Sequence, residues 1–148
     1  MKPTIQGEVE IVTPSGVTLI KQRNLVVNMH RPLIVRALAA VNPTIYAIKY
    51  IALGDGTNPP KVEDTALQHE IIRLEISSYT FPDEQSVIFE AYMDYSVGNG
   101  RTYTEAGLVT PVSDSYPQGM LFARTLLKKP INKDETFSFY IRWKITML

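Results

Sequence analysis

The sequence predicts a mainly β protein, built as an antiparallel β-sandwich with one or two short helices. Apolar and polar residues alternate with a period of two along much of the chain, and turn residues separate about eight or nine such segments. The length of 148 residues is typical of one domain, and no linker or internal repeat interrupts the pattern. We therefore expect residues 1–148 to form a single domain.

The clearest strand lies at the C-terminus. Phe137, Ile141, Trp143 and Met147 belong to an apolar face, and mostly polar side chains occupy the positions between them. This alternation places one face of a strand in the core and the other toward solvent. Trp143 is therefore expected to be a structural residue of the core.

A hairpin is expected in the middle of the chain. Apolar residues alternate from Val87 to Tyr95, and residues 82–84 form the turn before them. Residues 72–81 are predicted as the preceding strand, whose apolar phase shifts at Ser77 and Ser78 as a β-bulge would cause. Further strands are expected at residues 8–12, 17–20, 46–53, 103–109 and 120–127, with turns or loops at 14–16, 54–56, 98–100 and 130–134.

Two helices interrupt the strands. The apolar stripe of residues 33–41 has helical spacing, with Pro32 in the first turn and Asn42 and Pro43 at the end. A shorter helix is predicted at residues 65–71, with Asp64 as its N-cap.

Composition excludes several functional classes. The chain has no cysteine, which excludes disulfides, thiolate metal sites and thiol catalysis. Its 15 basic and 15 acidic side chains balance, so we expect no nucleic-acid partner and no anionic membrane surface. The N-terminus lacks the apolar core of a signal peptide, and no apolar run approaches the roughly 20 residues that span a bilayer. We expect a soluble protein.

The most unusual loop, residues 54–60, is considered as a ligand site. It does not match a phosphate-binding glycine motif. Asp55 with Glu63 and Asp64 could bind a hard cation, and His69 with neighbouring acids could bind a metal, but neither spacing matches a known motif. A turn stiffened by prolines is the favoured interpretation, and no cofactor or metal is expected.

Catalytic groups do not converge in the sequence. There is no GxSxG motif, and His30 and His69 have no recognisable triad partner. Glu90, Asp94 and Glu105 could form a carboxylate pair, but a solvated sheet surface explains the first two equally well. We expect the protein not to be an enzyme.

Aromatic side chains on the polar face of two strands are candidates for a protein contact. Ile88, Tyr92 and Tyr140 lie opposite the expected core. Either another protein or the helix at residues 33–41 would bury them, and both alternatives stay open.

Short blocks along most of the chain resemble a known group of proteins. The blocks are YIALGDGT (residues 50–57), DTAL (64–67), EIIR (70–73), EAGL (105–108), MLFAR (120–124), WKIT (143–146) and NLVVN (24–28). They resemble small structural proteins of tailed-bacteriophage virions. The N-terminal domains of tail-fibre proteins share the pattern ALGDG…L…E…R, which runs through the first three blocks, and the pattern E.GL of the fourth. Jelly-roll cement proteins that decorate capsids are similar in size and strand pattern.

This resemblance implies a jelly-roll-like sandwich and a non-enzymatic virion protein. We expect a capsid decoration (cement) protein that binds and stabilises the assembled major capsid lattice. The alternative is a tail or baseplate component, such as a tail-fibre attachment domain. Both imply other virion proteins as partners, a homo-oligomer and localisation in the virion. A carbohydrate-binding module that uses Tyr92, Tyr95 and Tyr140 is a third hypothesis.

The candidate site residues follow from these arguments. Partner contacts are expected at Asp55, Thr57, Asn58, Lys61, Tyr92 and Tyr140, and in the loop at residues 112–118. Structural roles are expected for Gly54, Gly56, Asp64, Glu105, Arg124 and Trp143. Glu105 is expected to form an ion pair with either Arg73 or Arg124.

Overall fold

The computed structural model describes residues 5–39 and 43–148. Within these ranges the chain forms nine strands, all joined in one antiparallel sheet, and two helices. The elements are β1 (Ile5–Val12), β2 (Thr18–Val26), α1 (His30–Ala39), α2 (Pro43–Tyr46), β3 (Tyr50–Gly54), β4 (Glu70–Glu75), β5 (Ser78–Asp83), β6 (Ser86–Met93), β7 (Arg101–Val109), β8 (Leu121–Lys133) and β9 (Phe139–Met147). The prediction of a mainly β protein is confirmed.

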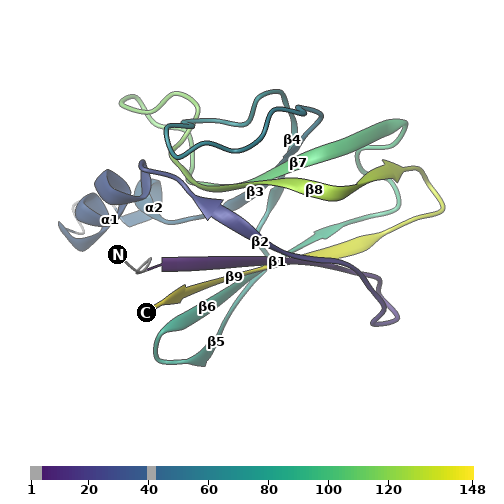
Figure 1. The fold of residues 1–148 in the computed structure, drawn as a ribbon, viewed down its shortest axis with the longest axis horizontal. Coiled ribbons are helices and arrows are strands. Elements are labelled where there is room, and N and C mark those ends of the chain that lie inside the picture. The colour runs from purple at the N-terminus through teal and green to yellow at the C-terminus, as the bar shows by residue number, and fades with distance from the viewer. Residues whose placement is uncertain (1–4, 40–42) are drawn as a thin grey trace.

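The sheet curls so that its two halves face each other (Figure 1). Its strand order is β4-β3-β7-β8-β2-β1-β9-β6-β5, and β2 links the half formed by β3, β4, β7 and β8 to the half formed by β1, β9, β6 and β5. The two ends of the sheet meet at Ile76 and Ser77. The amide of Ile76 donates to the carbonyl of Lys49 beside β3, and the amide of Ser77 donates to Glu90 in β6.

This junction corrects one prediction. Residues 72–81 are not one strand with a bulge, because β4 ends at Glu75 and β5 begins at Ser78 on the opposite edge of the sheet. The apolar phase shifts at Ser77 because the chain passes from one half of the sheet to the other. The predicted hairpin is confirmed, since residues 84–85 form the turn between β5 and β6.

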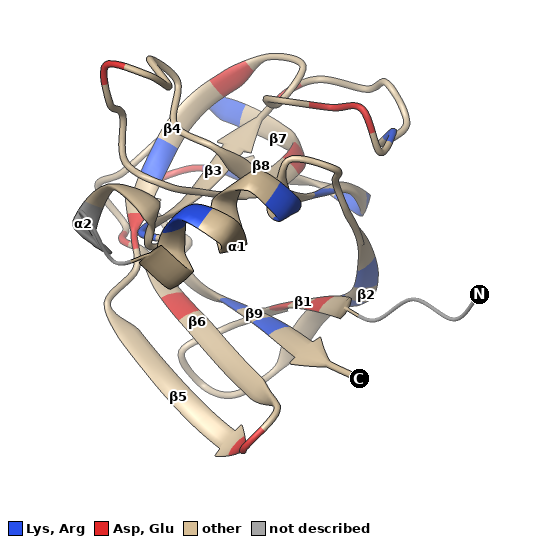
Figure 2. Ribbon diagram, turned by 90° about the vertical axis from the view of Figure 1, so that its left-hand side faces the viewer, with Lys and Arg blue, Asp and Glu red and all other residues tan. Residues whose placement is uncertain are grey.

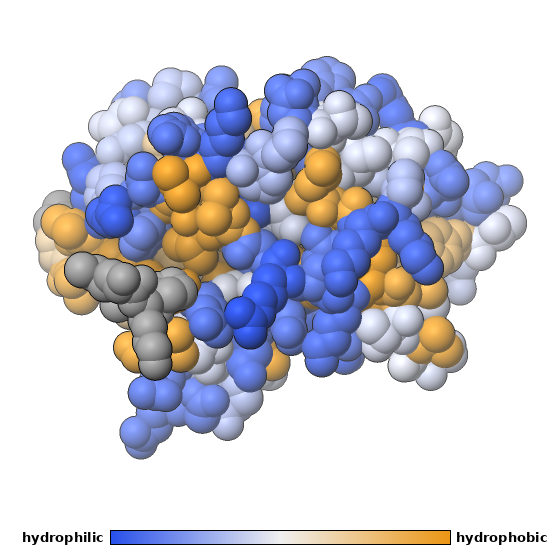
Figure 3. Space-filling view, in the orientation of Figure 1, coloured by the Kyte–Doolittle hydropathy of each residue, from blue (hydrophilic) through white to orange (hydrophobic). Residues whose placement is uncertain are grey.

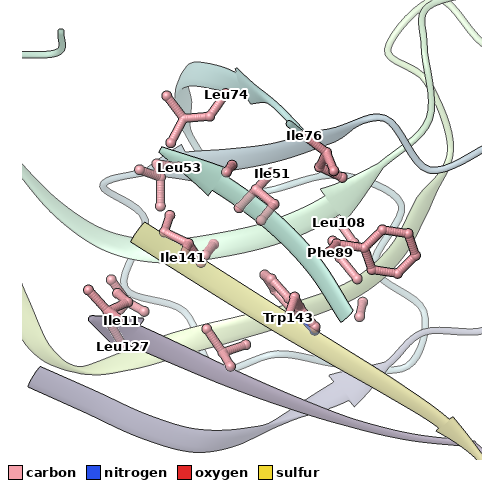
Figure 4. Close-up of a cluster of buried hydrophobic side chains, with 14 of the residues drawn as sticks. Ile11, Ile51, Leu53, Leu74, Ile76, Phe89, Leu108, Leu127, Ile141 and Trp143 are labelled. Atoms are coloured by element: carbon pink, nitrogen blue, oxygen red, sulfur yellow. The ribbon is translucent and has the colours of Figure 1, made fainter. Parts of the chain in front are cut away.

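The core fills the space between the two halves (Figure 4). Trp143 and Ile141 of β9 face Ile51 and Leu53 of β3, and all four are completely buried. Trp143 pairs in register with Val9 of β1 and Phe89 of β6, so it lies in the middle of its half.

A buried glutamine bridges the place where β2 and β8 diverge. The backbone ladder between these strands covers only Leu25 and Val26. Farther along, the amide nitrogen of Gln22 donates to the carbonyl of Leu126 at 2.7 Å, and its oxygen accepts from the amide of Lys128 at 2.8 Å. The side chain thus replaces the missing backbone pairing and satisfies buried polar groups.

The helix expected at residues 33–41 is observed as α1, with Pro32 in its first turn. Its apolar stripe is not buried as predicted: Leu33 is buried, Ile34 is half-buried, and Leu38 is 80% exposed. Val41 and Asn42 lie outside the described residues. Neither helix in the described ranges has the length and apolarity needed to cross a membrane.

Two other expected boundaries and one expected helix are wrong. Tyr46 belongs to α2, and β3 begins only at Tyr50. Residues 130–133 continue β8, because Pro130 is exposed on a strand whose partners resume at Ile131. Residues 65–69 form a loop before β4 and not a helix, for reasons given below.

Candidate interaction site

Residues 55–69, here called the anchored loop, fold over the outer face of the half-sheet formed by β3, β7 and β8 (Figure 1). Leu67 is the apolar contact that holds it there. This side chain is buried in a second hydrophobic cluster with Val27, Ala52, Val109 and Leu121. Gly107 on β7 makes room for it, since a Cβ there would lie 2.9 Å from a methyl group of Leu67.

Glu105 on β7 is the polar centre of the site. Its side chain is completely buried, and it accepts backbone hydrogen bonds from Gly56 at 2.7 Å, Gln68 at 2.9 Å and His69 at 2.8 Å. Both ends of the anchored loop are therefore fixed to one carboxylate. The guanidinium of Arg124 lies 3.0 Å from the same carboxylate and balances its charge.

Arg124 extends this network to the middle of the loop. Its side chain is 2% exposed; one terminal nitrogen lies 3.1 Å from Asp64, and the other donates to the carbonyl of Asn58 at 2.9 Å. Arg124 is thus the partner of Glu105. Arg73, the other candidate, pairs with Glu70 at 2.7 Å.

Asp64 is not the N-cap of a helix. Its carboxylate accepts from the amide of Lys61 at 2.9 Å and from Arg124, so it closes a turn of the loop. The apolar Leu67 that suggested a helix turns instead toward the sheet, where burial against β3, β7 and β8 outweighs local helix propensity.

Gly54 and Gly56 are required because of close approach. Neither has a positive φ. A Cβ on Gly54 would clash with the carbonyl oxygen of His69, and one on Gly56 would clash with the carboxylate of Glu105. The loop can reach the sheet only where these side chains are absent.

We expect Gly54→Ala to lower the free energy of unfolding by about 1–3 kcal/mol, because the clash is with backbone and not with a flexible side chain. Urea denaturation followed by circular dichroism measures it. Thr57→Ala, at an exposed position of the same loop, is the control and should change stability by less than about 0.5 kcal/mol. Equal stability of Gly54→Ala and the wild type would contradict the proposed role of close packing.

A second loop, residues 111–119, lies beside the anchored loop. Arg73 on β4, the strand that follows the anchored loop, donates to the carbonyl of Gln118 in this second loop. A pocket of about 450 Å³ separates the two loops and is lined by both, including His69, Val112 and Gln118. The outer surface of the two loops, residues 55–69 and 111–119, is here called the two-loop surface. The anchored loop contributes residues 65–69 to its pocket, and Asn58 and Lys61 line a separate hollow of the same loop.

Four of the six expected contact residues lie on the anchored loop. Asp55, Thr57, Asn58 and Lys61 are all exposed, and Asp55 contacts the ring of His69. The side chain of Gln68 fixes the backbone of two of them, because its oxygen accepts from the amides of Thr57 at 2.8 Å and Asn58 at 2.7 Å. Sequence reasoning missed Gln68, because a single exposed glutamine carries no signal of such a role.

Tyr92 and Tyr140 lie elsewhere, on the outer face of β6 and β9. They are paired in register and half-buried, and their rings stack with centroids 4.7 Å apart. The helix α1 packs mainly on β8 and α2, so the tyrosines bury area against each other. These two residues are not part of the two-loop surface.

The outer face beside the tyrosines carries compensating charges. Arg142 on β9 lies 2.7 Å from Glu90 on β6 and 3.9 Å from Glu10 on β1. The hydrogen bond to Glu90 raises the pKa of Arg142, so its charge is permanent. A face on which charges pair this way is typical of a solvated surface.

The candidate metal sites are not formed by a cluster of ligating side chains among the described residues. Within residues 5–39 and 43–148, no group of three or more His, Asp or Glu side chains is placed to hold a metal ion. Asp64, one of the expected oxygen donors, is engaged by Arg124.

Comparisons of the chain with protein families, with curated proteins and with solved structures find no match.

Proposed function

We propose that this chain is a non-enzymatic structural protein of a phage virion that binds other virion proteins through the two-loop surface. The observation that supports it most is the anchoring of residues 55–69. Glu105, Arg124 and Gln68 fix the backbone of this loop, while Asp55, Asn58 and other side chains stay exposed. A loop ordered before binding loses little conformational entropy when it meets a partner.

Within the virion we propose a capsid decoration (cement) role. Such a protein binds the assembled lattice and not the free subunits, and this differential binding stabilises the shell. A jelly-roll-like sandwich fits the two facing halves of the curled sheet, and virion symmetry favours a homo-oligomer. A tail or baseplate location is the alternative.

The copy number in purified virions tests the proposal. Quantitative mass spectrometry measures this chain relative to the major capsid protein. A ratio that matches the capsid lattice supports decoration, and a ratio that matches a ring moves the protein to the tail. Absence from the particle overturns the virion role and favours the carbohydrate-binding hypothesis.

We expect Lys61→Glu to weaken binding to capsids about tenfold, since a reversed charge at a contact costs about 1.4 kcal/mol or more. Lys61 is exposed on the anchored loop, and its side chain is not part of the anchoring network. Co-sedimentation with particles that lack the protein measures the affinity. Lys129→Glu, at another exposed lysine on β8, is the control and should bind like the wild type. Unchanged binding of Lys61→Glu would exclude this loop as the contact.

A further inference from the structure

An apolar pocket lies at the end of the molecule that carries α1, and no residue of the anchored loop lines it. It has a volume of about 370 Å³ and opens between α1, α2 and the β5–β6 hairpin. Its walls include Leu33, Tyr46, Phe81, Phe89 and Met147. A pocket of this size is large enough to take apolar side chains of a partner.

Apolar side chains project beside this pocket. Leu38 and Val35 on α1 are 80% and 65% exposed, and Phe81 on β5 is 75% exposed. At the chain end, Leu148 is 62% exposed. Figure 3 shows hydrophobic side chains gathered at the end of the molecule where α1 lies. Exposed apolar side chains gathered around a pocket in this way are typical of an interaction site.

The charges around the pocket are divided between its two sides (Figure 2). The sequence of α1 contains Arg31 and Arg36 and no acidic residue. Arg31 donates to the side chain of Asn28 at 3.2 Å and Arg36 to the carbonyl of Pro32 at 3.4 Å, and the guanidinium of Arg36 lies 5.7 Å from the ring centroid of Tyr116. Neither arginine pairs with a carboxylate among the described residues.

The hairpin on the other side of the pocket ends in acidic residues, Asp83 and Glu84 (Figure 2). Glu84 lines the pocket itself. The amide of Gln85 and the hydroxyl of Ser86 donate to Asp83, and these bonds lower the pKa of its carboxyl. Asp83 is therefore ionised at neutral pH.

We propose that the occupant of this pocket is a second copy of the chain, in a two-fold symmetric dimer. The α1 helix of each copy lies against the pocket of the other, with Leu38 inserted. Arg31 and Arg36 of one copy then face Asp83 and Glu84 of its partner. A two-fold contact requires a surface that is complementary to itself. This end of the molecule meets that requirement, because it combines projecting and receiving apolar surface and a basic and an acidic side.

This dimer would supply the interface of the homo-oligomer that the proposed function includes. The dimer proposal itself does not depend on the virion role. The purified chain alone tests it, by sedimentation velocity over a range of concentrations. The wild type is expected to dimerise in the micromolar range or tighter. Leu38→Glu should weaken dimerisation at least ~30-fold, as loss of a central apolar contact does. Circular dichroism checks that the variant is folded.

Val17→Glu is the matched control. Val17 is 57% exposed in the β1–β2 turn, at the opposite end of the molecule from α1. It introduces the same charge in place of an exposed apolar residue, and it should leave the dimer unchanged.

A charge exchange tests the orientation of the two copies. Arg36→Glu and Glu84→Arg should each weaken the dimer, because like charges then meet across the interface. The double variant should recover most of the lost affinity, since its charges are complementary again. Additive losses would exclude the proposed pairing.

Three results would overturn the proposal. The first is a wild type that stays monomeric up to about 100 μM, well above the range of a specific dimer. The second is a dimer that Leu38→Glu leaves intact. The third is a monomer in which native mass spectrometry finds a small apolar molecule, which would make the pocket a ligand site. A dimer formed by a chain that is absent from virions would retain this inference while the proposed function fails.

Discussion

Replacing Glu105 with glutamine is expected to lower the free energy of unfolding by about 3–5 kcal/mol, the usual cost of breaking a buried ion pair by removing one partner. Arg124 is 2% exposed and would keep its charge with no buried carboxylate beside it other than the half-buried Asp64. The NH2 group of the glutamine would also replace one of the two acceptor oxygens. It would then face either the amides of Gly56 and His69, or the amide of Gln68 and the guanidinium of Arg124, and these donors need an acceptor.

Urea denaturation of the variant, followed by circular dichroism, measures this loss. Glu75→Gln is the control, because Glu75 is 68% exposed and its pair with Lys49 lies at the surface. That change should stay within about 0.5 kcal/mol. A Glu105→Gln protein as stable as the control would show that the anchored loop does not depend on this carboxylate.

A double variant separates the charge from the shape of the site. In Glu105→Gln with Arg124→Met, both fully buried charges are absent, and only the partly exposed carboxylate of Asp64 loses its charged partner. We expect the double variant to lose less free energy of unfolding than the two single variants lose together, with a coupling energy of about 1–3 kcal/mol. Limited proteolysis at residues 55–69 reports whether the loop is still ordered.

Local pattern was enough to predict most of the sheet. The alternation around Trp143 and the hairpin turn predicted at residues 82–84 need only neighbours in sequence. The strand is observed, and the turn lies at residues 84–85. The phase shift at Ser77 was visible too. A bulge and a crossing to the opposite edge of a sheet produce the same shift, however, and only pairing with β3 and β6 distinguishes them.

The anchored loop could be predicted only in part. The sequence blocks around Glu105, Arg73 and Arg124 suggested an ion pair of Glu105 with one of the two arginines. The backbone amides that also bind it carry no side-chain signal, so nothing in the sequence indicated that one carboxylate holds both ends of a loop. The false helix at residues 65–71 has a related cause. Leu67 is buried against Gly107 and Ala52, which are distant in sequence and adjacent in space. Its apolar side chain therefore reflects this contact and not the face of a helix.

Replacing Trp143 with alanine is expected to lower the free energy of unfolding by about 3–5 kcal/mol, the range for removing a large buried aromatic side chain. Trp143 is completely buried between the two halves of the sheet, so the surrounding strands cannot collapse into the cavity without losing register. It is the only tryptophan of the chain, and circular dichroism must therefore replace fluorescence as the probe of urea unfolding. Tyr95→Ala, at a 49% exposed aromatic residue, is the control.

Trp143→Phe distinguishes volume from hydrogen bonding. The indole nitrogen donates to the side-chain oxygen of Asn24 at 2.9 Å. The Asn24 amide nitrogen meets no acceptor among the described residues, so phenylalanine would leave this buried amide without any partner. We expect Trp143→Phe to lower the free energy of unfolding by about 1–3 kcal/mol more than the smaller buried apolar area alone would.

The same geometry makes Gly7 part of the Trp143 site. Gly7 pairs with Asn24 in the β1–β2 ladder, and a Cβ at Gly7 would clash with the Asn24 side chain. Gly7→Ala should therefore displace the acceptor of the indole and destabilise the protein. In the Trp143→Phe background this part of the loss should shrink, because no indole bond remains to be broken. Equal effects of Gly7→Ala in both backgrounds would show that the glycine acts on packing alone.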